Sequence, residues 1–96
     1  MQAISTIETA SAKRYLGQFA KHFAHKLPVE LAEDSSSAVV KFSGGACRMK
    51  ADAARLRLEL DAPLAAMDTL KDVVAHHLVR FAFREELAVV WRHVVV

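Results

Sequence analysis

The chain has 96 residues and a formal net charge of +2, and 53% of its residues are hydrophobic. This length suits one domain and is too short for two ordinary cores, so we expect residues 1–96 to form a single domain. The hydrophobic share excludes a globally disordered chain. The small net charge lacks the strong, clustered excess that is typical of dedicated nucleic-acid binders.

The single cysteine, Cys47, cannot form an internal disulfide, so nothing indicates secretion. The first ten residues lack the basic and long apolar regions of a signal peptide. No stretch approaches the roughly 18 apolar residues that a membrane-spanning helix needs. We therefore expect a cytoplasmic protein without a membrane partner.

The first part of the chain predicts a strand followed by a helix. Residues 3–8 mix β-branched and polar side chains, as a short strand or an ordered extended arm does. Thr9 or Ser11 can cap a helix that runs from about Ala12 to His25, where apolar residues recur at steps of three and four. Pro28 ends this helix, because the residue before a proline is pushed out of the α region.

The middle of the chain changes to a period of two, which predicts strands. The clearest alternation places Leu56, Leu58 and Leu60 on one face. The breaks between strands are short, and the turn at residues 43–45 contains two glycines, so the segment reads as an antiparallel meander. Cys47 takes the core phase, where a buried thiol usually behaves as a small hydrophobe. The inward-facing residues of these strands are Val29, Leu31, Ala38, Val40, Phe42, Cys47, Met49, Ala51, Leu56, Leu58 and Leu60.

A second helix begins near Asp61 to Pro63 and ends around Arg84 to Glu86, and a last strand follows with Leu87, Val89 and Trp91 on one face. Each strand has one apolar face and each helix one apolar stripe. The economical arrangement is an α+β two-layer sandwich, with both helices on one face of a mainly antiparallel sheet, in the order β-α-β-β-β-β-α-β. The order of strands within the sheet does not follow from the sequence. We expect the core to join Leu56, Leu58, Leu60, Val89 and Trp91 with Phe19, Phe23, Leu70 and Val74.

A cluster of basic residues and histidines lies at the end of the first helix. His22 and His25 are three residues apart, so both side chains can reach one side of the helix. Two ligands are fewer than a zinc site needs, and the helical HExxH signature is missing. We therefore predict no bound metal and no cofactor. His22 flanks the apolar stripe beside Lys26, where it is either a surface residue or part of a binding site.

A second cluster lies at the end of the second helix. His77 falls in the middle of the apolar stripe, so its imidazole must be hydrogen-bonded, because an unpaired buried polar group costs about 1–3 kcal/mol. It is either a core residue or a group that contacts a ligand. Arg80 and Arg84 share one flank and suit a carboxylate or phosphate, unless they pair with Asp72, Glu85 or Glu86. The candidate ligand-binding residues are His22, His25, Lys26, His77, Arg80 and Arg84.

A third group of basic residues takes the outward phase of the strands. Such a face can follow nucleic-acid phosphates. The aromatic side chains that stack on bases are missing from this phase, so we expect a solvated face that contains salt bridges and does not bind nucleic acid. The basic residues of this face are Lys41, Arg48, Lys50, Arg55 and Arg57.

Several short strings of the chain occur together in one known family. They are Arg14–Leu16, Lys21–Val29, Gly45–Cys47, His77–Leu87 and Trp91. With this combination, the chain resembles the bacterial family known as domain of unknown function 2218. The resemblance covers nearly the whole chain but implies no established activity. Some members of the family are joined to siderophore-interacting flavoprotein reductase domains, which implies a link to iron utilisation.

Three functions are compatible with these observations. The favoured one is a binding or accessory module that recognises an anionic small molecule, a ferric chelate or a protein partner such as a flavoprotein reductase. The second is a small enzyme that uses His77 or His22 as an acid or base, for which the sequence offers no convincing partner carboxylate or nucleophile. The third is a scaffold that forms a homodimer through its sheet.

Overall fold

Six strands and two helices make up the part of the chain that the computed structural model describes, residues 1–82 and 85–94. In chain order they are β1 (Gln2–Glu8), α1 (Ala12–Ala24), β2 (Val29–Leu31), β3 (Ser37–Phe42), β4 (Gly45–Ala51), β5 (Arg55–Asp61), α2 (Leu64–Phe81) and β6 (Arg92–Val94). This order confirms the predicted β-α-β-β-β-β-α-β succession. No helix in the described residues is both long and apolar enough to cross a bilayer.

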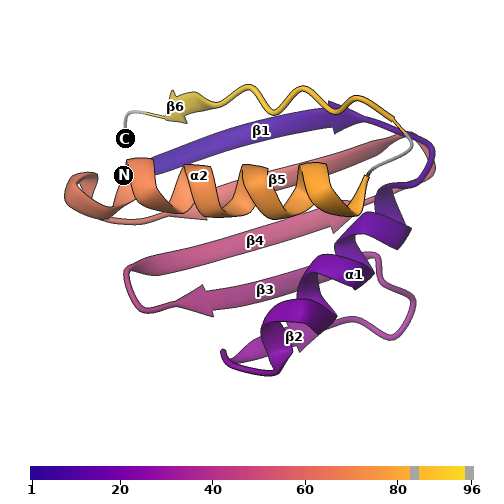
Figure 1. Cartoon of the computed structure of the whole chain (residues 1–96), viewed down its shortest axis with the longest axis horizontal. Helices are drawn as coiled ribbons and strands as arrows, with labels where there is room; N and C mark the ends of the chain where they lie inside the picture. Colours follow the sequence, from indigo (N-terminus) through magenta and orange to yellow (C-terminus); the bar gives the residue numbers. More distant parts are fainter. Residues whose placement is uncertain (83–84, 95–96) are drawn as a thin grey trace.

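The strands form one antiparallel sheet in the order β2-β3-β4-β5-β1-β6 (Figure 1). Strands β2 to β5 are neighbours in sequence and in space, as the short connections predicted. The N-terminal strand β1 lies between β5 and β6, so both of its partners come from later parts of the chain. The meander therefore accounts for four strands, and the two ends of the chain complete the sheet.

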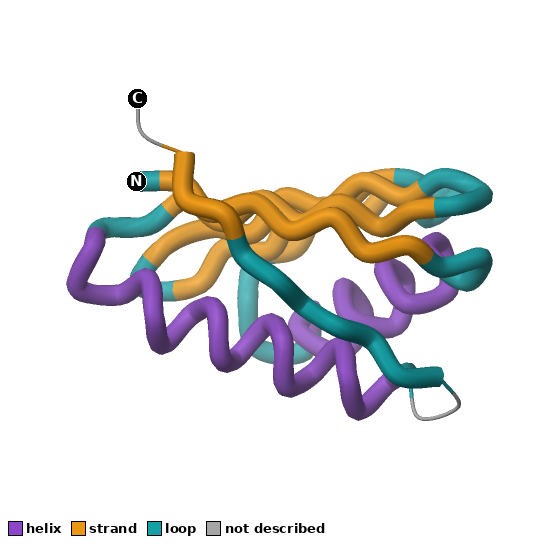
Figure 2. The backbone as a smooth tube through the Cα atoms, turned by 90° about the horizontal axis from the view of Figure 1, so that it is seen from above, coloured by secondary structure: helices purple, strands orange, loops and turns teal. Residues whose placement is uncertain are grey.

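Both helices cover the same face of the sheet, so the molecule has two layers (Figure 2). Helix α1 packs over β2, β3 and β4, and helix α2 packs over β5. The three β5 leucines are fully buried and share one core with Phe19 and Val74, while Trp91 packs against that core. The predicted α+β sandwich and its core are confirmed.

Neighbouring strands are aligned so that each residue has a direct partner across the sheet. Leu58 of β5 lies opposite Met49 of β4 and Ser5 of β1, and all three are buried. Successive side chains of a strand point to opposite faces, so the residue before Leu58, Arg57, points away from the helices. We call the side of the sheet that no helix covers the open face.

The start of α1 differs from the expected capping. Ser11 is the N-cap residue, but its side chain makes no capping hydrogen bond. Its backbone N–H donates instead to the Thr9 hydroxyl, at 3.1 Å. The Thr9 hydroxyl in turn donates to Glu85 Oε1 at 2.7 Å, and the Tyr15 hydroxyl donates to the same oxygen at 2.6 Å. The Glu85 carboxylate thus connects the segment after α2 to the beginning of α1.

Helix α2 ends earlier than the sequence suggested, at Phe81 rather than around Arg84 to Glu86. The backbone N–H of Ala82 still bonds to the Leu78 carbonyl, and the Glu85 N–H donates to the Ala82 carbonyl. Beyond this end, the Glu85 carboxylate accepts hydrogen bonds from Thr9 and Tyr15, a long-range contact that local periodicity does not encode.

The last strand begins later than the sequence suggested, at Arg92 rather than near Leu87. Only Arg92–Val94 pairs with β1, opposite Gln2–Ile4. Leu87, Val89 and Trp91 still alternate in burial with exposed neighbours, and Val90 is 70% exposed. This segment crosses from the helix layer to the sheet layer, as Figure 2 shows. Its apolar side chains therefore pack against the core, but its backbone does not pair with β1 before Arg92.

Two adjacent glycines give a test of the turn between β3 and β4. A Cβ atom on Gly45 would lie 2.5 Å from the Asp61 carbonyl oxygen and 2.7 Å from the Ala62 Cβ, whereas one on Gly44 meets nothing closer than 3.1 Å. We expect Gly45→Ala to lower the free energy of unfolding by about 1–3 kcal/mol, because backbone must move to relieve the overlap. Gly44→Ala should cost clearly less. Urea unfolding of both variants measures the difference, and equal midpoints would contradict this account.

The Glu85 contact gives a test that depends on pH. The two donated hydroxyl bonds hold the pKa of the Glu85 carboxyl below its ordinary value. Its contribution to stability is therefore present above the pKa of an unfolded glutamate, about 4.3, and is lost as pH falls through the lower folded value. We expect Glu85→Gln to destabilise the protein at pH 7 and to differ much less from the wild type at pH 3.

The matched control is Glu86→Gln, which removes the same charge from the next residue. Urea unfolding of both variants at the two pH values makes the comparison. A Glu86→Gln variant that lost as much stability as Glu85→Gln, or a Glu85→Gln deficit that stayed constant with pH, would show that the carboxylate does not act through Thr9 and Tyr15.

Candidate functional site

The two motifs at the helix ends meet through their histidines. His22 lies in the last turn of α1 and His77 in the second half of α2, and their ring centroids are 5.1 Å apart with an interplanar angle of 44°. We call these two residues the imidazole pair. They come together because α1 and α2 pack side by side on the same face of the sheet.

Aromatic rings surround the imidazole pair. The Phe23 ring lies 4.9 Å from His77 and 5.0 Å from His22, and the Phe81 ring lies 5.6 Å from His22. Phe23 in turn packs edge-on against Phe42 of β3, at 5.2 Å. These phenylalanines are half-buried and belong to the margin of the core. The two imidazoles and these phenylalanines therefore form a continuous group of rings that reaches from the edge of the core to the surface.

His77 makes the hydrogen bond that its position requires. Its Nδ1 lies 2.7 Å from the carbonyl oxygen of Val73, one helical turn earlier. A carbonyl can only accept, so Nδ1 carries the proton, and the neutral ring keeps its lone pair on Nε2. The prediction that this half-buried imidazole is hydrogen-bonded is confirmed. The remaining nitrogen can accept a proton or a hydrogen bond.

The charges around His22 are positive. Contact with the neighbouring rings removes water from its imidazole, and this desolvation is the main cause that lowers its pKa below the ordinary value. His77, His25, Lys26 and Arg80 lower the pKa further by repelling a proton. His22 is therefore a neutral group at pH 7 within a positive field, which is a setting that favours a bound anion.

The structure brings most of the predicted site residues together. His22 and His77 are in contact, and Lys26, Arg80 and His25 are close enough to act on the His22 charge. Apart from the half-buried His77, these side chains are exposed, and His25 caps the end of α1. Arg84 lies outside the described residues.

Sequence reasoning missed the use that the structure makes of Glu85. This acid was a candidate partner for Arg80 or Arg84, but its Oε1 accepts from Thr9 and Tyr15. The pKa of the Tyr15 hydroxyl is raised above its ordinary value, mainly because this hydroxyl donates to the Glu85 carboxylate. No pattern in the sequence links residues so far apart, so only the fold reveals this contact.

Other reactive groups lie away from the imidazole pair. Cys47 is fully buried in the core, and burial raises the pKa of its thiol to about 12, so it is a structural residue without a nucleophilic thiolate. Among residues 1–82 and 85–94, no group of three or more His, Cys, Asp or Glu side chains is placed to hold a metal ion. The imidazole pair itself offers two nitrogen ligands.

The five basic residues of the open face are all exposed, as the strand phase predicted: Lys41, Arg48, Lys50, Arg55 and Arg57. Four hollows in the described part of the chain are lined by residues other than the imidazole pair. Two of these hollows lie on the open face, and a third, of about 490 Å³, lies between α2 and the segment before β6, where Asp72, His76 and Val89 line it.

Comparison with known proteins agrees with the fold. The NMR structure of PA4090 from Pseudomonas aeruginosa is 30% identical in sequence and superposes with a TM-score of 0.78, over 95% of this chain and 94% of that chain. No protein with a curated description matches the chain. Residues 4–92 match the model of the family described as "Uncharacterized protein conserved in bacteria (DUF2218)". The chain therefore belongs to this family of uncharacterised bacterial proteins.

Proposed function

We propose that this protein is a small binding module that recognises an anionic, aromatic small molecule on the surface around the imidazole pair. The observation that carries the proposal is the set of charges acting on His22. The four neighbouring groups whose charges affect it, His77, His25, Lys26 and Arg80, are all basic, and Lys26 and Arg80 carry a positive charge at pH 7. An anion at this position would offset the repulsion among these basic groups.

The rings around the pair define the other half of the ligand. Phe81 and the two imidazoles present aromatic surface to solvent, since Phe81 and His77 are half-buried and His22 is exposed. Flat aromatic groups pack on such rings by offset stacking or edge-on contact. Arg80 adds a planar guanidinium, which pairs with carboxylates and also stacks on rings. An aromatic anion satisfies both properties at once.

Ferric catecholate chelates belong to this chemical class, because they are negatively charged and present flat aromatic rings. The family resemblance supports them, since some members are joined to siderophore-interacting flavoprotein reductase domains. In this proposal the protein holds the chelate, and a flavoprotein reductase is the partner that would act on it. The proposed binding residues are His22, Lys26, His77 and Arg80, with His25 beside them; Arg84, also a candidate from the sequence, lies outside the described residues.

Acid–base catalysis by His77 or His22 receives less support. A general acid or base needs a partner that orients it and matches its pKa to the reaction. Within the described residues, the hydrogen bond of His77 goes to a backbone carbonyl of its own helix, which is a structural arrangement. The lowered pKa of His22 makes it available as a base, but a carboxylate that would assist it is not among the groups that act on it most strongly.

The proposal predicts that ligand binding changes the protonation of His22. We expect the gallium(III) complex of 2,3-dihydroxybenzoate, a diamagnetic substitute for the ferric chelate, to raise the pKa of His22 toward its ordinary value. The anion would favour the charged imidazole that the surrounding cations now disfavour. Proton NMR titration of the five histidines, with and without the complex, measures this shift.

Variants separate binding from folding. We expect His77→Gln and Arg80→Ala to weaken binding of the complex by about tenfold or more, the loss typical of one charge-assisted hydrogen bond, while most of the thermal stability remains. His93→Gln, which changes a histidine on β6 beside Lys71, is the matched control and should bind normally. Equal binding by all three variants, or binding that leaves the His22 pKa unchanged, would refute the proposal.

A further inference from the structure

A row of four polar side chains crosses the open face of the sheet, on the side opposite the helices. The pairing register places Ser37 of β3 opposite Lys50 of β4, Lys50 opposite Arg57 of β5, and Arg57 opposite Thr6 of β1. All four residues are exposed. We call them the Lys50–Arg57 row. Two cations thus lie next to each other, with a hydroxyl side chain at each end.

The charges in this row are arranged differently from those beside it. On the β4–β5 ladder, Arg48 lies opposite Glu59, and on the β1–β5 ladder, Glu8 lies opposite Arg55. Both are opposite-charge pairs, which stabilise antiparallel strands. Lys50 and Arg57 form a like-charge pair, which destabilises them. The sheet therefore contains a local concentration of positive charge that its own cross-strand pairing does not neutralise.

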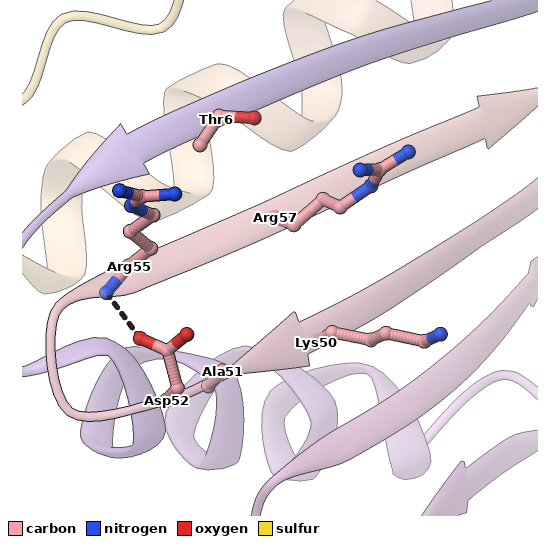
Figure 3. A pocket seen from close by; sticks show the side chains of 6 residues that line it. All are labelled: Thr6, Lys50, Ala51, Asp52, Arg55 and Arg57. Atoms are coloured by element: carbon pink, nitrogen blue, oxygen red, sulfur yellow. Dashed lines mark hydrogen bonds between the residues drawn. The ribbon is translucent and has the colours of Figure 1, made fainter.

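Two acids lie beside this pair: Glu59, which lies opposite Arg48, and Asp52, in the turn that joins β4 and β5. The Asp52 carboxylate accepts from the backbone N–H groups of Ala54 and Arg55, both at 2.8 Å. These bonds lower the pKa of Asp52 and hold its carboxylate at the backbone. Figure 3 shows this bond to Arg55, with the Lys50 side chain extending away from Asp52. The hydrogen bonds of the turn thus account for Asp52, whereas they give no role to the side chains of Lys50 and Arg57.

The surface is hollowed on both sides of the like-charge pair. A hollow of about 290 Å³ is lined by Thr6, Lys50, Ala51, Asp52, Arg55 and Arg57 (Figure 3). A second hollow, of about 140 Å³, lies beside it, and Lys50 and Arg57 line this one as well. Both cations are therefore reachable by a small molecule that sits in the hollow and contacts neighbouring strands.

We infer that Lys50, Arg57 and Thr6 bind a phosphate group of a small phosphorylated molecule on the open face. An ammonium group, a guanidinium fork and a hydroxyl are the donors that phosphate oxygens prefer. Neighbouring strands are about 4.8 Å apart, so a diphosphate can contact Lys50 and Arg57 together. The row contains hydroxyls where a nucleic-acid binder would have stacking rings, which favours a small molecule over a polynucleotide.

The test compares two arginines of the same face. Arg57→Gln and Arg48→Gln remove one positive charge each from β5 and β4, but only Arg57 belongs to the like-charge pair. We expect pyrophosphate, titrated calorimetrically at constant ionic strength, to bind the wild type and Arg48→Gln with similar affinity and to bind Arg57→Gln at least tenfold more weakly. Lys50→Gln should behave as Arg57→Gln does. Without ligand, Arg57→Gln should unfold at a higher temperature than the wild type, because repulsion is relieved.

Several results would overturn this inference. Equal losses of pyrophosphate affinity in Arg48→Gln and Arg57→Gln would show that pyrophosphate responds to the overall positive charge of the open face and not to a specific site. The absence of pyrophosphate binding at millimolar concentration would exclude the site. A single-stranded oligonucleotide that bound more tightly than pyrophosphate would exclude the small-molecule assignment. The His77→Gln variant should bind pyrophosphate as the wild type does, so this test is independent of the function proposed for the imidazole pair.

Discussion

The alternation of β5 is the constraint on which the rest of the structure depends. Leu56, Leu58 and Leu60 of this strand lie under the helices, while Arg55 and Arg57 point to the open face. Because strand side chains alternate, a shift of one residue in pairing would bury the charges and expose the leucines. The strand lies between β4 and β1, so its register also fixes theirs. The core that supports the imidazole pair and the row of cations on the other face both follow from this single alignment.

The sequence predicted the layers because they depend on local periodicity. A step of two marked the strands and steps of three and four marked the helices, so the single apolar face of each element was visible. The order of strands was not visible, because β1 pairs with β5 and β6 through contacts that no short segment encodes. The predicted end of α2 and start of the last strand were wrong because both depend on long-range contacts, the bond of Tyr15 to Glu85 and the pairing of β6 with β1. The burial of Ser5 was not visible either, because a serine marks no apolar phase; among the described residues its hydroxyl has no hydrogen-bond partner.

The two surfaces illustrate how far residue types can predict a site. Helical phase placed His22 beside the apolar stripe and His77 within it, but their contact depends on how α1 and α2 pack together. The strand phase identified Lys50 and Arg57 as outward-facing, but that they face each other is a matter of register. Chemistry-bearing residues were thus found from the sequence, whereas their partners were found only in the fold.

The place of β1 in the sheet has a consequence for how the chain assembles during synthesis. The hairpins from β2 to β5 join segments that leave the ribosome one after another, so they can form as they emerge. Strand β1 is made before its partners β5 and β6, so its edges stay unpaired while the strands from β2 to β4 are synthesised. Until then the sheet presents a vacant position beside β5, which β1 of another nascent chain fits equally well. At the close spacing of a polysome, exchange of β1 between copies competes with pairing inside one chain, and faster pairing of β1 with β5 favours the intramolecular sheet.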